Sequence, residues 1–212
     1  MSGNTAQRDL MVLVADTEMA QTIKGLLDRP ASLATALVDV NVERHPGRDS
    51  GCRIGAVDFL RPFLGRYRYA LVVFDLHGSG STSTREATQR EVDANLARNG
   101  WENRGKAIVI EPELEAWVWG RSPRVADVLG WTAGYADLRR WLHSEGLWPD
   151  GEAKPPDPRT AMKKTMAKTR LRKSPRVFFD LANAVSLDKC RDPSFGDLRA
   201  TLHSWFPPPP SP

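Results

Sequence analysis

Acidic side chains follow three apolar segments of the chain, at the points where each segment gives way to polar residues. Asp16 comes after the first segment, Asp75 and then His77 end another, and Glu115 lies just beyond a third. Carboxylates gathered at one place repel one another unless a hard cation holds them, and Mg²⁺ or Mn²⁺ suits such an oxygen-rich cluster. We therefore predict a site with Asp16, Asp75, His77 and Glu115 as metal ligands, in which the three carboxylates also take part in catalysis. The plainer alternative is that Asp16 caps a helix and the glutamates are solvated helix starts.

The two glutamates of Glu113-Leu114-Glu115 are predicted to have different surroundings. Side chains two residues apart on a helix point about 200° away from each other. Trp119 follows Glu115 at helical spacing, which indicates that Glu115 borders a buried face. A buried glutamate needs a partner or a metal ion. We expect Glu115 to face the site and Glu113 to be exposed.

Alternating strand and helix patterns in the first half would bring these acids together. Apolar runs predict strands near residues 9–15, 36–43, 69–75 and 106–110, and periodic segments predict helices between them, near residues 17–29, 56–65 and 85–98. Residues 45–52 are polar and contain glycine, which indicates a loop. Strands separated by helices form parallel βαβ units. The fold class is therefore α/β, with a Rossmann-like parallel sheet of about four strands whose carboxyl ends meet at one edge.

The second half of the chain is predicted to be helical. Ser122-Pro123, Asp157-Pro158, Ser174-Pro175 and Asp192-Pro193 each place a capping side chain before proline, which is typical of a helix start. Only residues 177–179 resemble a further strand. Four tryptophans are expected to form the core of this half or its contact with the sheet: Trp131, Trp141, Trp148 and Trp205. We expect an α/β core over residues 1–120, a helical extension packed on it over residues 121–206, and a proline-rich tail over residues 207–212.

Basic residues dominate residues 158–179, which contain no acid. Lys164, Lys168 and Arg172 are spaced four residues apart and would form one line on a helix. Such a line could hold a nucleic-acid backbone with salt-dependent affinity, although charge runs are usually solvated faces. Lys163 or Lys168 could instead reach the metal site and neutralise a phosphate. The residues predicted to bind nucleic acid are Lys163, Lys164, Lys168, Arg170, Arg172 and Lys173.

Composition places few limits on function. The chain has 212 residues, 41% of them hydrophobic and 26% charged, and a net charge of +4 that permits an anionic partner. Cys52 and Cys190 are far apart and form no metal-binding motif. The polar N-terminus lacks the apolar core of a secretion signal, and no apolar run is long enough to span a bilayer. We expect a cytoplasmic protein that has no contact with a membrane.

Three motifs resemble those of the TOPRIM-like proteins. They are Val12-Leu13-Val14-Ala15-Asp16-Thr17-Glu18, Val72-Val73-Phe74-Asp75-Leu76-His77 and Pro112-Glu113-Leu114-Glu115-Ala116-Trp117. The chain is more closely similar to the small bacterial members encoded beside defence ATPases and restriction genes, which often carry a C-terminal pattern like Cys190-Arg191-Asp192-Pro193-Ser194-Phe195-Gly196-Asp197-Leu198. Two positions depart from the family pattern. Ala15 or Asp16 replaces its first glutamate, and His77 replaces the second of two aspartates.

The resemblance implies a TOPRIM-like fold, metal-dependent cleavage of DNA or RNA, and partner proteins in a bacterial anti-phage defence system. A softer histidine ligand weakens Mg²⁺ binding and affects Mn²⁺ less. The alternative function is a catalytically degenerate TOPRIM-like adaptor of a defence complex. A third reading, a binder of small nucleotides, has no Gly-x-Gly-x-x-Gly motif to support it.

Overall fold

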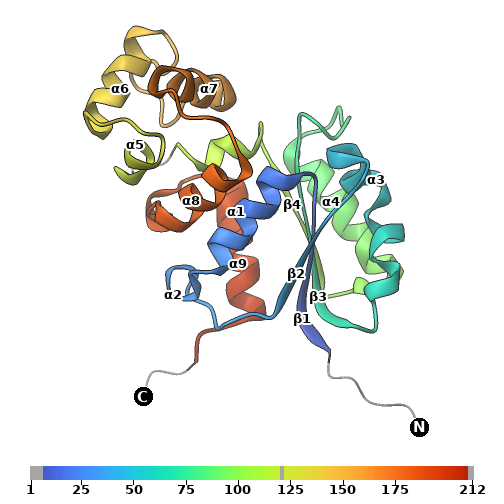
Figure 1. The fold of residues 1–212 in the computed structure, drawn as a ribbon. Helices are drawn as coiled ribbons and strands as arrows, with labels where there is room; N and C mark the ends of the chain where they lie inside the picture. The colour runs from blue at the N-terminus through green and yellow to red at the C-terminus, as the bar shows by residue number, and fades with distance from the viewer. Residues whose placement is uncertain (1–6, 120–121, 210–212) are drawn as a thin grey trace.

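Four parallel strands form a single sheet in the computed structural model, which describes residues 7–119 and 122–209 (Figure 1). The strand order is β2-β1-β3-β4, and each neighbouring pair is parallel. The strands are β1 (Arg8–Val14), β2 (Val40–Arg44), β3 (Tyr67–Asp75) and β4 (Gly105–Ile110). The predicted α/β class with an all-parallel sheet of four strands is confirmed.

Helices cover both faces of the sheet. α1 (Thr17–Leu27) and α9 (Pro193–Trp205) lie on one face, and α3 (Arg48–Leu60) and α4 (Arg85–Leu96) lie on the other (Figure 1). α8 (Pro175–Ala184) packs against α1. The shorter or more peripheral helices are α2 (Pro30–Leu33), α5 (Arg124–Val128), α6 (Tyr135–Ser144) and α7 (Pro158–Thr169), and short turns of other helix types lie at Arg61–Phe63, Ala97–Trp101, Leu114–Trp117 and Leu187–Lys189.

The central strands are buried on both faces, as parallel strands between helical layers must be. Every residue from Leu10 to Val14 is inaccessible to solvent, and so is nearly all of the segment from Ala70 to Phe74. Near the start of β3, the ring of Trp205 on α9 stacks on Tyr69 with ring centroids 4.7 Å apart. Trp205 therefore joins the C-terminal helix to the sheet.

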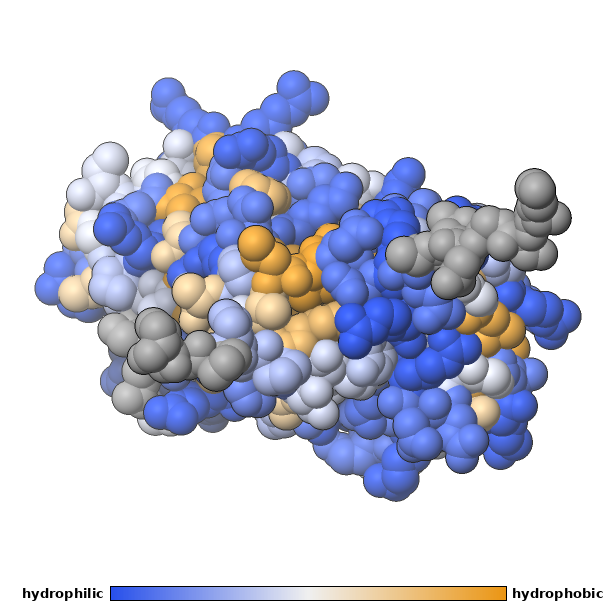
Figure 2. Space-filling view, turned by 90° about the horizontal axis from the view of Figure 1, so that it is seen from below, coloured by the Kyte–Doolittle hydropathy of each residue, from blue (hydrophilic) through white to orange (hydrophobic). Residues whose placement is uncertain are grey.

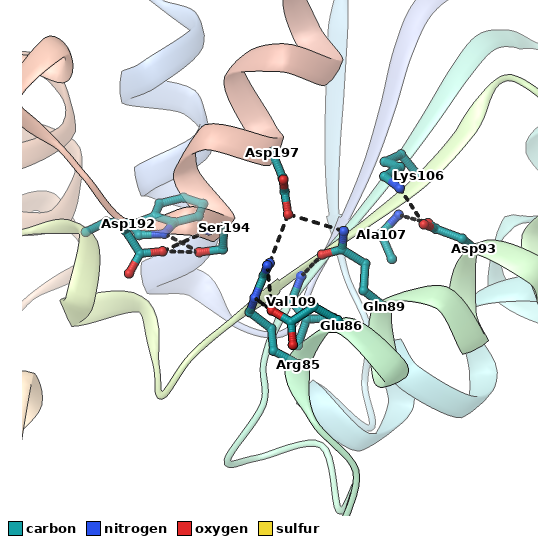
Figure 3. Close-up of polar contacts among 11 residues, drawn as sticks. Arg85, Glu86, Gln89, Asp93, Lys106, Ala107, Val109, Asp192, Ser194 and Asp197 are labelled. Atoms are coloured by element: carbon teal, nitrogen blue, oxygen red, sulfur yellow. Dashed lines mark hydrogen bonds and ion pairs between the residues drawn. The ribbon is translucent and has the colours of Figure 1, made fainter.

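The outer edge of β4 is closed by side chains of α4 (Figure 3). The backbone N–H of Ala107 donates to Asp93 at 2.7 Å, and that of Val109 donates to Gln89 at 3.2 Å. Gln89 also contacts Asp197 of α9, which accepts a hydrogen bond from Arg85 at 2.9 Å. These contacts satisfy backbone groups that an edge strand would otherwise leave open to another chain.

The segment between β1 and α3 differs from the prediction. β2 begins at Val40 rather than near residue 36, because the ladder with β1 starts where Val40 pairs with Leu10. α3 begins at Arg48, within the predicted loop. Its first residue has a φ of 53°, and its N-cap Gly47 makes no side-chain hydrogen bond, so the sequence carries no capping signal there. Pro62 lies in the short turn that follows α3.

The predicted helix starts are correct at three of the four dipeptides. Asp157 and Asp192 cap α7 and α9 with their carboxylates, and α8 begins at Pro175. Ser122 is not a cap, because α5 begins after Pro123 and the Ser122 hydroxyl accepts from the backbone of Ser186. The possible strand at residues 177–179 is wrong, since these residues lie within α8, where Val177 and Phe178 are buried.

The side of the molecule at which β1 begins carries mostly hydrophilic residues with small apolar patches between them (Figure 2). In residues 7–119 and 122–209, no helix is long and apolar enough to cross a membrane. The proline-rich tail, residues 207–212, lies partly outside the described residues, which end at residue 209.

Candidate functional site at the carboxyl edge of the sheet

Asp16 and Asp75 lie at the carboxyl ends of the two central strands, β1 and β3. Asp16 comes two residues after Val14 of β1 and accepts a hydrogen bond from the backbone N–H of Met19 at 2.9 Å, which caps α1. Asp75 is the last residue of β3. The helices after β1 and β3 leave toward opposite faces of the sheet (Figure 1). Such a switch point is the usual place for a ligand in an open parallel sheet.

Asp49 is a third carboxylate of this edge, and it was not predicted from the sequence. It lies in the first turn of α3, and its Oδ1 accepts a hydrogen bond from the backbone N–H of Asp75 at 2.8 Å. Its Oδ2 lies where a Cβ on Gly78 would come within 2.3 Å. The available signal was its position, because Asp49 lies in the first turn of the helix after β2, much as Asp16 caps the helix after β1.

Glu113 and Glu115 both face the cluster, so the predicted exposure of Glu113 is wrong. The Glu113 residue is 7% exposed and Glu115 is 3% exposed. Glu113 is extended, and Glu115 lies in the short 3₁₀ turn Leu114–Trp117. The 200° separation expected for two residues of an α-helix therefore does not apply.

Arg159 of α7 joins three of these carboxylates. Its Nη2 lies 2.7 Å from Glu113 Oε2 and 3.9 Å from Asp75 Oδ2, and its Nε lies 3.6 Å from Glu115 Oε1. Trp119 holds the start of α7 in place, because its indole N–H donates to the carbonyl of Pro158 at 2.9 Å. The basic run thus reaches the acidic edge through Arg159, which was not among the predicted site residues.

Lys173 is a second cation of the cluster. Its Nζ lies 3.0 Å from Glu18 and 3.9 Å from Glu115. Arg48 is a third cation and lies 3.6 Å from Asp16. The acidic edge is therefore compensated by three cations from separate parts of the chain.

Burial raises the pKa of Asp75 well above its usual value. The nearby carboxylates of Asp49, Glu115 and Asp16 raise this pKa further, while Arg159 lowers it. Asp75 Oδ1 is buried and has no hydrogen-bond partner among the described residues. A buried acceptor without a partner costs about 1–3 kcal/mol. Asp75 is therefore set to take up either a proton or a cation.

Burial also raises the pKa values of two neighbouring carboxyl groups, those of Glu115 and Asp49. Burial raises the pKa of Glu115, against the opposing influence of Arg159. Burial also raises the pKa of Asp49, while its hydrogen bond from Asp75 lowers it. Coupled carboxyls of this kind share protons as a group, and added positive charge favours their ionised forms.

These residues fit a hard cation in their chemistry but not in their present spacing. Carboxylate oxygens, one of them unpartnered, are the donors that Mg²⁺ and Mn²⁺ prefer. Within the described ranges, however, no group of three or more Asp, Glu, His or Cys residues is arranged to hold a metal ion. Arg159 lies between three of the carboxylates. A bound ion would require the Arg159 side chain to move.

His77 is not brought to the carboxylate cluster. It lies in the turn after β3, its side chain is exposed, and no contact of its imidazole with the acids is observed in the described part of the chain. The structure thus gathers Asp16, Asp75 and Glu115 from the predicted set, and adds Asp49, Glu113 and Arg159.

The predicted nucleic-acid residues divide into two groups. Lys163 and Lys173 line a cleft beside the carboxylates. α7 ends at Thr169 and Arg170 is left-handed, so Arg172 does not continue the line of Lys164 and Lys168, and that prediction is wrong. The second group is exposed and does not line this cleft. Its members are Lys164, Lys168, Arg170 and Arg172.

Fold and site define a parallel α/β protein with a cluster of carboxylates at the switch point of its sheet. No family model matches the chain. Neither the curated proteins nor the solved structures include a significant match to it.

Proposed function

We propose that this protein is a TOPRIM-like, metal-dependent nuclease that uses Asp75 and Glu115, with Asp16 beside them, to hold Mg²⁺ or Mn²⁺. One observation carries the proposal: Asp75 is buried at the end of β3, is surrounded by Asp16, Asp49 and Glu115, and has an unpartnered oxygen. A cation would remove the repulsion and supply the missing partner. When bound, it would activate water and stabilise the charge on a phosphoryl group.

The chain's own residues have distinct parts in this proposal. Asp49 accepts from the backbone N–H of Asp75 and so fixes the end of β3. Arg159 neutralises the carboxylates until the ion binds, and its guanidinium is then free to contact a phosphate. Lys173 holds Glu18 and Glu115 on the other side of the cluster.

Metal-dependent cleavage is the direct test. Purified protein is incubated with Mg²⁺ or Mn²⁺ and labelled single- and double-stranded DNA and RNA. Asp75→Asn removes one charge at the site, and Asp58→Asn is the matched control because Asp58 is an exposed residue of α3 paired with Arg61. We expect cleavage by the parent and by the control, and loss of more than 100-fold in Asp75→Asn. Equal cleavage by all three proteins would refute the assignment.

A catalytically degenerate adaptor is the second candidate. The arrangement of Arg159 among three carboxylates favours it, because a guanidinium in this position can replace the metal permanently. Calorimetric titration separates the two functions. A nuclease site binds Mn²⁺ in the parent but not in Asp75→Asn, whereas an adaptor binds no ion and cleaves no substrate.

The motif resemblance supports a role for either form in bacterial anti-phage defence, together with partner proteins. Cells that carry the protein and its neighbouring genes are challenged with phage, and plating efficiency is compared with that of an Asp75→Asn strain. Lower plating in the parent strain alone supports a catalytic role in defence. Equal protection by both strains supports the adaptor.

A further inference from the structure

A cleft of about 660 Å³ lies beside the carboxylate cluster, and its lining is rich in cations. Arg44 and Arg48 come from the end of β2 and the start of α3, whereas Lys163 comes from α7. Arg159 and Lys173 also line it, and the acids among its lining residues are Asp16 and Glu18. Segments far apart in the sequence thus place five cationic side chains around one cavity.

Four helices begin at this cleft. The first turns of α1, α3, α7 and α8 each contribute a lining residue, namely Thr17, Arg48, Arg159 and Pro175. Each of these helices has at least ten residues. The N-terminal end of a helix carries partial positive charge and free N–H groups, which favour a bound anion. The helix N-termini therefore favour a bound anion in this cleft, as the cationic side chains also do.

Arg44 and Lys163 are the lining cations without an ion pair to a carboxylate among the described residues, and Lys163 acts on Asp157 only at longer range. Arg44 donates to the hydroxyl of Thr17 at 2.8 Å, and neither Arg44 nor Lys163 forms an ion pair among the described residues. The remaining lining cations are paired, Arg48 with Asp16, Arg159 with Glu113 and Lys173 with Glu18. An anion in the cleft would meet the positive charge of Arg44 and Lys163 without displacing an existing pair.

We propose that this cleft binds phosphate esters, with Arg44 and Lys163 contacting phosphates next to the one at the carboxylate cluster. The inference rests on the proposed function, because it assigns the substrate-binding surface of that site. It also replaces the exposed line of Lys164 and Lys168 with the cleft as the surface that holds the ligand. The chemistry is shared by a nucleic-acid strand and a free nucleotide, and the experiment separates these sources.

Binding is measured by fluorescence anisotropy with a labelled 12-nucleotide single strand, on the Asp75→Asn background so that cleavage does not interfere. Arg44→Gln/Lys163→Gln removes two charges from the cleft, and Lys164→Gln/Lys168→Gln removes two from the exposed face of α7. We expect the cleft pair to weaken binding at least tenfold and to reduce the salt dependence of log K by about 1.4, since each lost contact to a single strand contributes about 0.7. The α7 pair should change affinity less than threefold.

Competition identifies the source of the phosphate. Inorganic phosphate, a nucleoside monophosphate and the unlabelled strand are titrated against the labelled strand. Displacement by the strand at a concentration at least tenfold lower than the monophosphate supports a nucleic-acid ligand, and equal displacement supports a nucleotide. Loss of binding in the α7 pair with retention in the cleft pair would overturn the inference, as would no binding by the parent background.

The two proposals fail in different ways. An absence of cleavage in the parent, together with cleft-dependent binding on the Asp75→Asn background, would refute the nuclease and leave the phosphate cleft intact. Cleavage that is unchanged by Arg44→Gln/Lys163→Gln at limiting substrate would refute the cleft and leave the nuclease intact. Thermal unfolding of each variant verifies that the changes have not unfolded the protein.

Discussion

The carboxylate of Asp49 accepts a hydrogen bond from the backbone N–H of Asp75 at 2.8 Å. The two residues lie 26 positions apart, one at the start of α3 and the other at the end of β3. This bond connects the helix on one face of the sheet to the strand that presents the buried carboxylate. The position of Asp75 therefore depends on α3 as well as on its own strand.

Gly78→Ala tests this connection. A Cβ at residue 78 would come within 2.3 Å of Asp49 Oδ2, so the Asp49 side chain or the turn must move. We expect a loss of about 1–3 kcal/mol in the free energy of unfolding, measured with urea. Gly65→Ala is the control, because nothing lies within 4 Å of its added Cβ. Equal stabilities of the two variants would show that Asp49 does not require this space.

Asp75→Asn is expected to change how stability depends on pH. Because the folded-state pKa of Asp75 is raised, the unfolded chain loses this proton first as pH rises above about 4. Stability therefore falls with rising pH until the folded-state pKa is passed. The Asn variant lacks this fall, so without divalent ions it should be about 1–3 kcal/mol more stable than the parent at pH 8.

This difference should shrink toward pH 3, below the usual Asp pKa of about 3.9, where Asp75 is mostly protonated in both states. Urea unfolding at several pH values in the presence of a chelator provides the measurement. Asp58→Asn serves as the control, since the Asp58 side chain is 79% exposed. If the stabilities of the parent and of Asp75→Asn depended on pH in the same way, the pKa of Asp75 would not be raised by burial.

Arg159→Gln should make the protein more dependent on divalent ions. The change leaves Asp75, Glu113 and Glu115 without their shared counter-charge, and we expect a loss of about 1–3 kcal/mol when metal is absent. Mn²⁺ should then raise the melting temperature more in the variant than in the parent. Arg124→Gln removes a cation from an exposed pair and should behave like the parent. A variant that is destabilised but unaffected by Mn²⁺ would support the adaptor.

Trp119→Phe tests how the start of α7 is positioned. The side chain stays aromatic, but the larger indole of this buried residue and its hydrogen bond to the carbonyl of Pro158 are lost. We expect a loss of about 1 kcal/mol and a more mobile Arg159, and hence tighter Mn²⁺ binding by calorimetry. Trp205→Phe is a control away from the site, where the ring of Trp205 stacks on Tyr69. Unchanged Mn²⁺ affinity in Trp119→Phe would show that Trp119 does not influence the site through Arg159.

The sequence was most informative where burial decides the structure. Continuous apolar runs predicted β1, β3 and β4 to within about two residues at each end, because both faces of these strands are covered. Parallel pairing then brought Asp16 and Asp75 to one edge. The start of α3 was missed because Arg48 opens this helix from a left-handed conformation without a capping side chain.

The rest of the site depended on contacts between distant parts of the chain. Glu113 was expected to be exposed because a helix was assumed where the chain forms an extended residue and a 3₁₀ turn. Arg159 belongs to a run of basic residues, and only the packing of α7 distinguishes it from the others. No local pattern predicts which member of such a run will reach a carboxylate.

The late position of Arg159 in the chain has a consequence for synthesis. Roughly 80 residues separate it from Asp75, which corresponds to roughly 4–16 s of translation at about 5–20 residues per second. By the end of that interval the ribosome has produced every carboxylate of the edge but not the guanidinium that compensates Asp75, Glu113 and Glu115. A nascent chain that folds its sheet early would carry this excess of negative charge until α7 emerges, so the last third of the polypeptide completes the electrostatic balance of the first half.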